Sequence, residues 1–163
     1  MLQTDALTIA FVTFAFVVQL ALIAHFALRK WAFATAMRFG PLIYALCIPA
    51  TIVSVALWVG GKPWYLWAAG FIYTTWAVYG YTVEYILHID WRQPVRWGVL
   101  IPYVTLYLAS MMFYWWPLAT IEQTLWYVYA ALFVISTVLN VISHKGPEEA
   151  AGVRSVSHTH GMA

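Results

Sequence analysis

Five long apolar runs separated by short polar gaps dominate the pattern of this chain. The runs cover residues 6–28, 40–59, 64–87, 97–116 and 124–142. Each has the length that an α-helix needs to cross the roughly 30 Å hydrocarbon core of a bilayer. Because the gaps are short, consecutive helices are expected to be antiparallel neighbours. The pattern predicts an all-α, polytopic membrane protein: a compact bundle of five transmembrane helices in residues 1–144, followed by a disordered tail in residues 145–163.

Two features interrupt this regular pattern. The first gap, residues 29–39, mixes basic with aromatic residues and predicts a short amphipathic segment in the membrane interface. Pro49 and Pro102 fall inside the second and fourth runs. A proline inside a helix leaves one backbone carbonyl without its N–H partner, so we expect both helices to be kinked there.

Polar and small residues recur at helical spacing inside four of the runs. Steps of three, four or seven place the members of each set on one face of a helix. Such faces usually pack helix against helix, because small and hydroxyl residues allow close approach. The tyrosine-rich faces are equally compatible with a polar-lined cavity, and both interpretations are kept. The sets are Tyr44, Cys47, Thr51 and Ser54; Gly70, Thr74, Ala77, Tyr81, Glu84 and His88; Tyr103, Tyr107, Ser110 and Tyr114; and Tyr129, Ser136, Asn140 and Ser143.

Glu84 is the only carboxylate inside a predicted span. Inserting such a group costs roughly 2.5–3.5 kcal/mol even on the lenient insertion scales, which makes it a candidate functional residue. His88 follows four residues later, on the same face of a continuous helix. The pair could share a proton as catalytic acid and base, or supply two ligands to a metal. In the alternative interpretation, Glu84 lies within one turn of the inner boundary and only meets headgroup water or an arginine.

The polar groups at the depth of Glu84 are expected to meet one another, because each is costly when it faces lipid. Helices two, four and five should therefore turn their polar faces towards the third run. His25, near the inner end of the first run, lies at the same depth and either packs inward or reaches the interface. Two histidines at one depth permit bis-histidine haem ligation, but the spacing is not specific, so no cofactor or metal is assigned. The predicted ligand-binding residues are His25, Tyr44, Tyr81, Tyr103, Tyr107 and Asn140, beside the candidate catalytic residues Glu84 and His88.

Composition excludes several functions. With 64% hydrophobic and 9% charged residues, the chain has no room for a soluble domain beside five spans. No gap holds a basic cluster that could neutralise several phosphates, which excludes nucleic acid as a partner. Cys47 is the only cysteine, so dithiol chemistry is excluded. No span contains a lysine, which excludes a retinal Schiff base.

The distribution of basic residues predicts the orientation. Alternate gaps lie on the same side of a membrane, and seven of the eight basic residues fall on one side. The positive-inside rule makes that side cytoplasmic, with the N-terminus outside and the C-terminus inside, and favours the cell (inner) membrane. The seven are Arg29, Lys30, Arg38, Arg92, Arg96, Lys145 and Arg154; Lys62 is the exception.

Together these features favour a protein that binds, and if it is an enzyme transforms, an apolar or amphipathic small molecule: a lipid, isoprenoid, quinone or tetrapyrrole. The ligand would occupy an aromatic-lined cavity in the cytoplasmic half of the bundle, among membrane lipids. The alternative is a non-catalytic membrane subunit that packs into a homo-oligomer or a larger complex. In architecture and tryptophan content alone, the chain resembles the translocator-protein family, small bundles that bind porphyrins and sterols. No residue role is carried over from that resemblance.

Overall fold

The computed structural model describes residues 5–89 and 95–143, and in that part the chain forms helices and no sheet. The predicted tail, residues 145–163, lies outside the described residues. The elements are α1 (Ala6–Trp31), α2 (Phe33–Ala45), α3 (Cys47–Val59), α4 (Trp64–Tyr81), the π-helical turn η1 (Thr82–Ile86), α5 (Trp97–Trp115), α6 (Leu118–Ile121) and α7 (Gln123–Ser143).

Four helical stretches of the described chain are long and apolar enough to cross a membrane. They overlap the first, second, fourth and fifth predicted spans. α4 is not among them, because its tryptophans and tyrosines lower its hydropathy. The all-helical fold is thus confirmed, with four helical stretches that are long and apolar enough to span a membrane, whereas the number of five spans and their orientation stay predictions. The four stretches are Ala6–Trp31, Phe33–Val59, Trp97–Ile121 and Gln123–Ser143.

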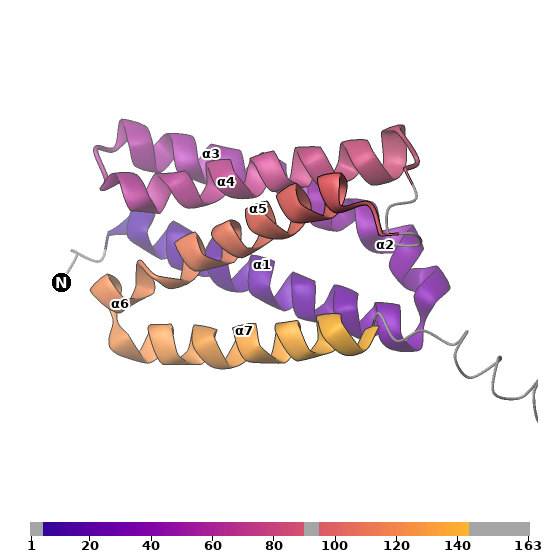
Figure 1. The fold of residues 1–163 in the computed structure, drawn as a ribbon. Helices are drawn as coiled ribbons and strands as arrows, with labels where there is room; N and C mark the ends of the chain where they lie inside the picture. Colours follow the sequence, from indigo (N-terminus) through magenta and orange to yellow (C-terminus); the bar gives the residue numbers. More distant parts are fainter. Residues whose placement is uncertain (1–4, 90–94, 144–163) are drawn as a thin grey trace, which may run out of the picture.

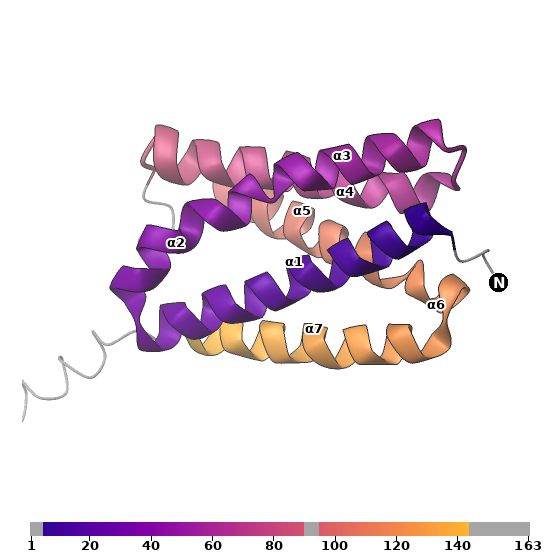
Figure 2. The same ribbon diagram turned by 180° about the vertical axis from the view of Figure 1, so that it is seen from behind.

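The long helices run roughly parallel or antiparallel to one another in one bundle (Figure 1). α3 and α4 lie side by side on one side, α1 and α7 lie on the other, and α5 crosses obliquely between them (Figures 1 and 2). α4 contacts both α3 and α5, and α1 contacts both α2 and α7. α5 and α7 diverge towards the end of the bundle where α2 lies (Figure 1). The expected antiparallel order therefore holds, but α7 packs chiefly on α1 rather than on its neighbour in sequence.

The segment between the first two spans continues as helix. Only Ala32, with φ −143° and ψ 64°, separates α1 from α2. The basic and aromatic residues expected in an interfacial turn form the last turn of α1 and the first turns of α2, which slants away from α1 (Figure 2). α2 ends at Ala45 and α3 begins at Cys47. Because Pro49 has no N–H to donate to the Ala45 carbonyl, this interruption lies where the proline predicts it. α5 continues without interruption through Pro102.

The polar face of the second run packs against the third, as predicted. The Thr51 and Thr74 hydroxyls are 2.8 Å apart, and each donates to the carbonyl of Cys47. Close by, a Cβ atom placed on Gly70 would meet the Ser54 hydroxyl and would lie 2.6 Å from the Ala50 carbonyl oxygen. The small residue thus allows α3 and α4 to approach closely, which is the packing role of such faces.

A buried amide that the sequence pattern did not single out fixes α7 against α1. The Gln19 side chain is fully buried, and its Nε2 donates to Ser136 Oγ at 2.7 Å and to the Leu132 carbonyl at 3.0 Å. The polar face of the fifth run therefore turns largely towards α1, so the prediction that it faces the third run is wrong for Ser136. An amide in hydrocarbon needs partners, and the hydroxyl and carbonyl of α7 supply them for Nε2, whereas Oε1 has no partner among the described residues.

At the opposite end of the bundle, Asp5 joins the start of α1 to the α3–α4 turn. Its carboxylate accepts hydrogen bonds from the Thr8 N–H at 3.0 Å and the Thr8 hydroxyl at 2.9 Å, and it pairs with Lys62 Nζ at 2.7 Å. The hydrogen bond from Lys62, followed by those from Thr8, lowers the pKa of Asp5 from its ordinary 3.8 to about 2. A lowered folded-state pKa stabilises the fold above the ordinary value, and this stabilisation is lost as the pH falls through the folded-state value.

We therefore expect Asp5→Asn to lower the melting temperature in detergent at neutral pH, and the difference from the parent to shrink between pH 4 and pH 2. Asparagine can still cap the helix, so the variant removes chiefly the charge. Thermal unfolding at a series of pH values measures the effect. An equal difference at pH 7 and pH 2 would contradict the ion-pair origin.

Candidate functional site

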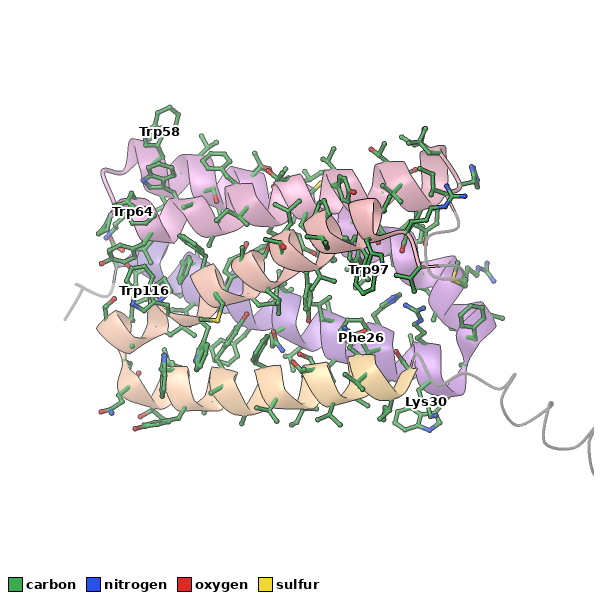
Figure 3. The ribbon with its side chains drawn as sticks, viewed as in Figure 1. Phe26, Lys30, Trp58, Trp64, Trp97 and Trp116 are labelled. Carbon is green, nitrogen blue, oxygen red and sulfur yellow. The ribbon has the colours of Figure 1, made fainter. Side chains whose placement is uncertain are left out.

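A cavity of about 430 Å³ lies at the end of the bundle where α2 connects α1 to α3. Residues of α1, α2, α4, η1, α5 and α7 form its wall. In Figure 3, Phe26 points from α1 towards the space between α1 and α5. The wall contains all the predicted site residues except Tyr81: Glu84, His88, His25, Tyr44, Tyr103, Tyr107 and Asn140.

Glu84 lies within a widened helical turn rather than in a continuous α-helix. α4 ends at Tyr81, and the Leu87 N–H bonds to the Thr82 carbonyl at 2.8 Å, five residues back. His88 follows with a left-handed backbone, φ 48°, which ends the helix. The prediction that an α-helix continues to Leu87 and places His88 one turn beyond Glu84 is therefore wrong. π-turns of this kind are frequent at functional sites, because they redirect side chains.

The carboxylate of Glu84 belongs to a chain of hydroxyls from two other helices. The Tyr44 hydroxyl donates to Glu84 Oε2 at 2.7 Å and lies 3.3 Å from the Tyr103 hydroxyl. Tyr44 is buried, whereas Glu84 and Tyr103 are half-buried in the cavity wall. The predicted contact of Tyr44 with Glu84 is thus confirmed, and Tyr103 is connected to Glu84 through the Tyr44 hydroxyl. This short hydrogen bond from Tyr44 holds the Glu84 carboxyl group in position.

Gly80 allows these two tyrosines to lie against α4. A Cβ atom at Gly80 would be 2.7 Å from a ring carbon of Tyr44 and 3.0 Å from one of Tyr103. The small residues of the third run thus make room for neighbouring side chains: Ser54 at Gly70, and the two tyrosine rings at Gly80. The space beside Gly80 is filled by protein, so the cavity lies beyond these rings.

Trp76 is the centre of the aromatic part of the wall. Its ring centroid lies 5.5 Å from that of Tyr44 and 5.7 Å from those of Tyr103 and Tyr107, all in tilted arrangements. Its indole is 2% exposed, and its N–H has no hydrogen-bond partner among the described residues. The buried Tyr107 hydroxyl likewise has no hydrogen-bond partner among the described residues. Buried polar atoms without partners are uncommon in proteins.

Other parts of the wall are more polar. His25 and Arg29 of α1 line them together with Asn140 of α7. His25 lies close to Gly40 of α2, so it packs inward, which was one of the two positions considered for it. His88 is exposed at the cavity edge, with Nδ1 3.2 Å from the Ile86 carbonyl. The cavity thus carries groups of both charge signs.

Tyr81 and Tyr85 exchange the places that an α-helical pattern predicts. Tyr81 is 42% exposed and outside the cavity wall, where its ring stacks on Tyr85 at 5.3 Å. Tyr85, which the sequence pattern did not single out, lines the cavity and reaches the backbone at Gly40. The change of phase in η1 accounts for Tyr85, since each residue after Tyr81 is rotated relative to an α-helix. Tyr81 itself belongs to α4, before this change, and its exposure has no such explanation.

The arrangement can transfer a proton, since it combines a carboxylate, four phenols and two imidazoles around one space. Among the residues that the structure describes, no three histidine, cysteine or carboxylate side chains gather to hold a metal ion. No family model, curated protein or solved structure matches the chain. The site must therefore be interpreted from its own residues.

Proposed function

We propose that the chain crosses the cell (inner) membrane five times, with α4 as the third span. α4 packs between α3 and α5, and it buries Tyr73 and Trp76 inside the bundle. Exposed tryptophans mark both ends of the bundle: Trp58, Trp64 and Trp116 lie at one end, and Trp97 lies at the other (Figure 3). Such rings prefer the two interfaces of a bilayer, so α4, which begins at Trp64, has the position of a span.

Reporter fusions test this topology. Fusions after Lys62 and after Thr120 are expected to be outside, because the basic residues on the other side are retained in the cytoplasm. Fusions after Arg38, Gln93 and Gly146 are expected to be inside. Each position is scored with a reporter active only outside and one active only inside. A cytoplasmic signal after Lys62 would contradict the five-span arrangement.

We further propose that the protein binds an apolar or amphipathic small molecule in the cavity and, if it is an enzyme, transforms it there. The observation that supports this most directly is the cavity itself. Its volume of about 430 Å³ falls within the range of roughly 300–1,000 Å³ that is typical of small-molecule sites. Aromatic and aliphatic side chains form most of its wall, and a few polar groups converge on it. This is the composition of a site for a lipid, isoprenoid, quinone or tetrapyrrole.

Glu84 is the proposed proton donor or acceptor in any reaction. Tyr44 holds its Oε2 atom, and Tyr103 continues the hydrogen-bonded chain along the cavity wall. A proton can thus pass between the carboxylate and a ligand either directly or through a phenol. The aromatic faces of Trp76 and Tyr103 can stabilise a cationic centre in the ligand and so act together with the Glu84 carboxylate.

The decisive experiment identifies what co-purifies with protein extracted in mild detergent. Lipid mass spectrometry and an absorption spectrum are compared for the parent and two variants. Leu100→Trp places a large side chain in the cavity wall, whereas Ile101→Trp, the next residue, places it on the outer surface. We expect a stoichiometric small molecule in the parent and in Ile101→Trp, reduced at least fivefold in Leu100→Trp.

Each other outcome identifies a different function. A haem spectrum lost in Leu100→Trp would specify a tetrapyrrole, with His25 and His88 as candidate ligands. Equal small-molecule content in Leu100→Trp and Ile101→Trp would show that any bound lipid is on the outer surface and would contradict the cavity proposal. Protein partners in fixed ratio, without a small molecule, would support a non-catalytic subunit instead.

A further inference from the structure

The two sides of the cavity differ in chemistry. Glu84 of η1, Tyr44 of α2 and Tyr103 of α5 are joined by hydrogen bonds in one part of the wall. Apart from Tyr103, α5 and α7 contribute the apolar side chains Leu100, Val104 and Leu108, together with Tyr107, Thr137 and Asn140. A ligand that satisfies both sides has a polar head and an apolar body.

Several cavity residues of α5 and α7 are exposed on the outer surface, as are Met37 and His88 in another part of the wall. Val104 and Leu108 line the cavity and yet are 39% and 43% exposed, and Thr137 of α7 is exposed as well. α5 and α7 make few contacts with each other, and they diverge towards this end in both views (Figures 1 and 2). An opening bounded by α5 and α7 therefore connects the cavity to the surface of the bundle.

This opening lies at hydrocarbon depth. Val104 and Leu108 follow the start of α5 by seven and eleven residues, and Thr137 precedes the end of α7 by six. At about 1.5 Å per residue, these positions lie roughly 9–16 Å from the helix ends. The neighbouring exposed residues Ile101 and Val138 are apolar, as expected for a surface in contact with acyl chains. The opening thus faces lipid rather than water.

We propose, on the basis of the proposed ligand-binding function, that the ligand is a single-chain membrane lipid that enters sideways between α5 and α7. Its head lies against Glu84, Tyr44 and Tyr103, and its chain extends past Val104, Leu108 and Thr137 into the adjoining leaflet. A single chain fits because the cavity volume of about 430 Å³ is near the lower end of the usual range for ligand sites. The lipid exchanges directly with the bilayer, without passing through water.

The test measures how fast a photoactivatable single-chain lipid reaches the inner wall. The probes are palmitic acid and palmitoyl-lysophosphatidylcholine, each with a diazirine near the carbonyl end, added in phosphatidylcholine vesicles that are fused to proteoliposomes. Flash illumination at successive times, followed by peptide mass spectrometry, gives the rate at which the segment containing Tyr103 is labelled. Excess unlabelled palmitic acid or lysophosphatidylcholine defines the specific part. Whichever probe labels the wall identifies the head chemistry.

Two adjacent residues of α7 supply the matched variants. Thr137→Trp narrows the opening, and Val138→Trp adds the same side chain to the outer surface beside it. We expect labelling at least tenfold slower in Thr137→Trp and a rate like the parent's in Val138→Trp. The double variant Val104→Ala/Leu108→Ala widens the opening and should label faster than the parent, which keeps the test valid if Thr137→Trp folds poorly.

The outcomes separate this inference from the function on which it rests. Equal rates in parent, Thr137→Trp and Val104→Ala/Leu108→Ala would overturn lateral entry but leave a ligand in the cavity. No specific labelling of the parent by either probe would overturn the single-chain lipid, while a different small molecule that co-purifies would still support the cavity. An empty cavity in the co-purification experiment would overturn both.

Discussion

Glu84→Gln is expected to reduce occupancy of the cavity by the co-purifying ligand about tenfold or more, while the melting temperature changes little. Glutamine keeps the size of the side chain, and its carbonyl oxygen can still accept the hydrogen bond from Tyr44. The variant loses the negative charge and the capacity to exchange a proton. A hydrogen bond from the ligand to a charged group contributes about 1.5–3 kcal/mol, compared with about 0.5–1.5 kcal/mol for a bond to a neutral group. The difference corresponds to roughly one order of magnitude in affinity for the ligand.

The matched control is Glu122→Gln, which removes an exposed carboxylate between α6 and α7, outside the Glu84 cavity. Ligand content by mass spectrometry and thermal unfolding are measured for both variants in the same detergent. Tyr44→Phe gives an independent measure, because it removes the hydroxyl that positions the carboxylate while it keeps the ring. If Glu84→Gln retained the parent's ligand content, Glu84 would be an interfacial residue and the proposed site would lose its principal group.

Helical spacing predicted correctly those contacts that depend on one regular helix face. Thr51 and Ser54 face α4 as their spacing requires, and Tyr44 and Tyr103 meet beside Glu84. These contacts follow from a general constraint: polar groups at one depth of a bilayer lower their free energy by partnering one another. Five apolar runs and one internal carboxylate were therefore enough to place the candidate site at one end of the bundle.

The errors have two physical origins. Spacing assumes 3.6 residues per turn, so the π-turn that begins at Thr82 displaced the later residues, and Tyr85 took a place in the cavity wall that the spacing did not predict. The spacing of polar residues within one helix also does not indicate which neighbouring helix the polar face will contact. Gln19 is the only amide side chain in the first run, and its partners on α7 became evident only when the two helices were packed together. A lone buried amide is nevertheless a signal that could have been used, since it requires a partner.

Gly70→Ala is expected to lower the stability of the bundle by about 1–3 kcal/mol, the range usual for an added methyl group in a closely packed contact. The new Cβ atom would meet the Ser54 hydroxyl and lie 2.6 Å from the Ala50 carbonyl oxygen. The serine side chain can rotate, but the carbonyl belongs to the backbone of α3. α3 must therefore move away from α4.

This movement is expected to reach the candidate site as well. α3 continues directly from α2, which carries Tyr44, so a shift of α3 at Ala50 pulls the Tyr44 hydroxyl away from Glu84. Gly70→Ala should therefore lower both the melting temperature and the ligand content. The control is Gly98→Ala near the start of α5, where a Cβ atom meets nothing within 4 Å and alanine favours the helix. Equal melting temperatures for the two variants would show that α3 and α4 are not held in contact at Gly70. A loss of stability in Gly70→Ala with unchanged ligand content would show instead that the cavity is formed independently of this helix crossing.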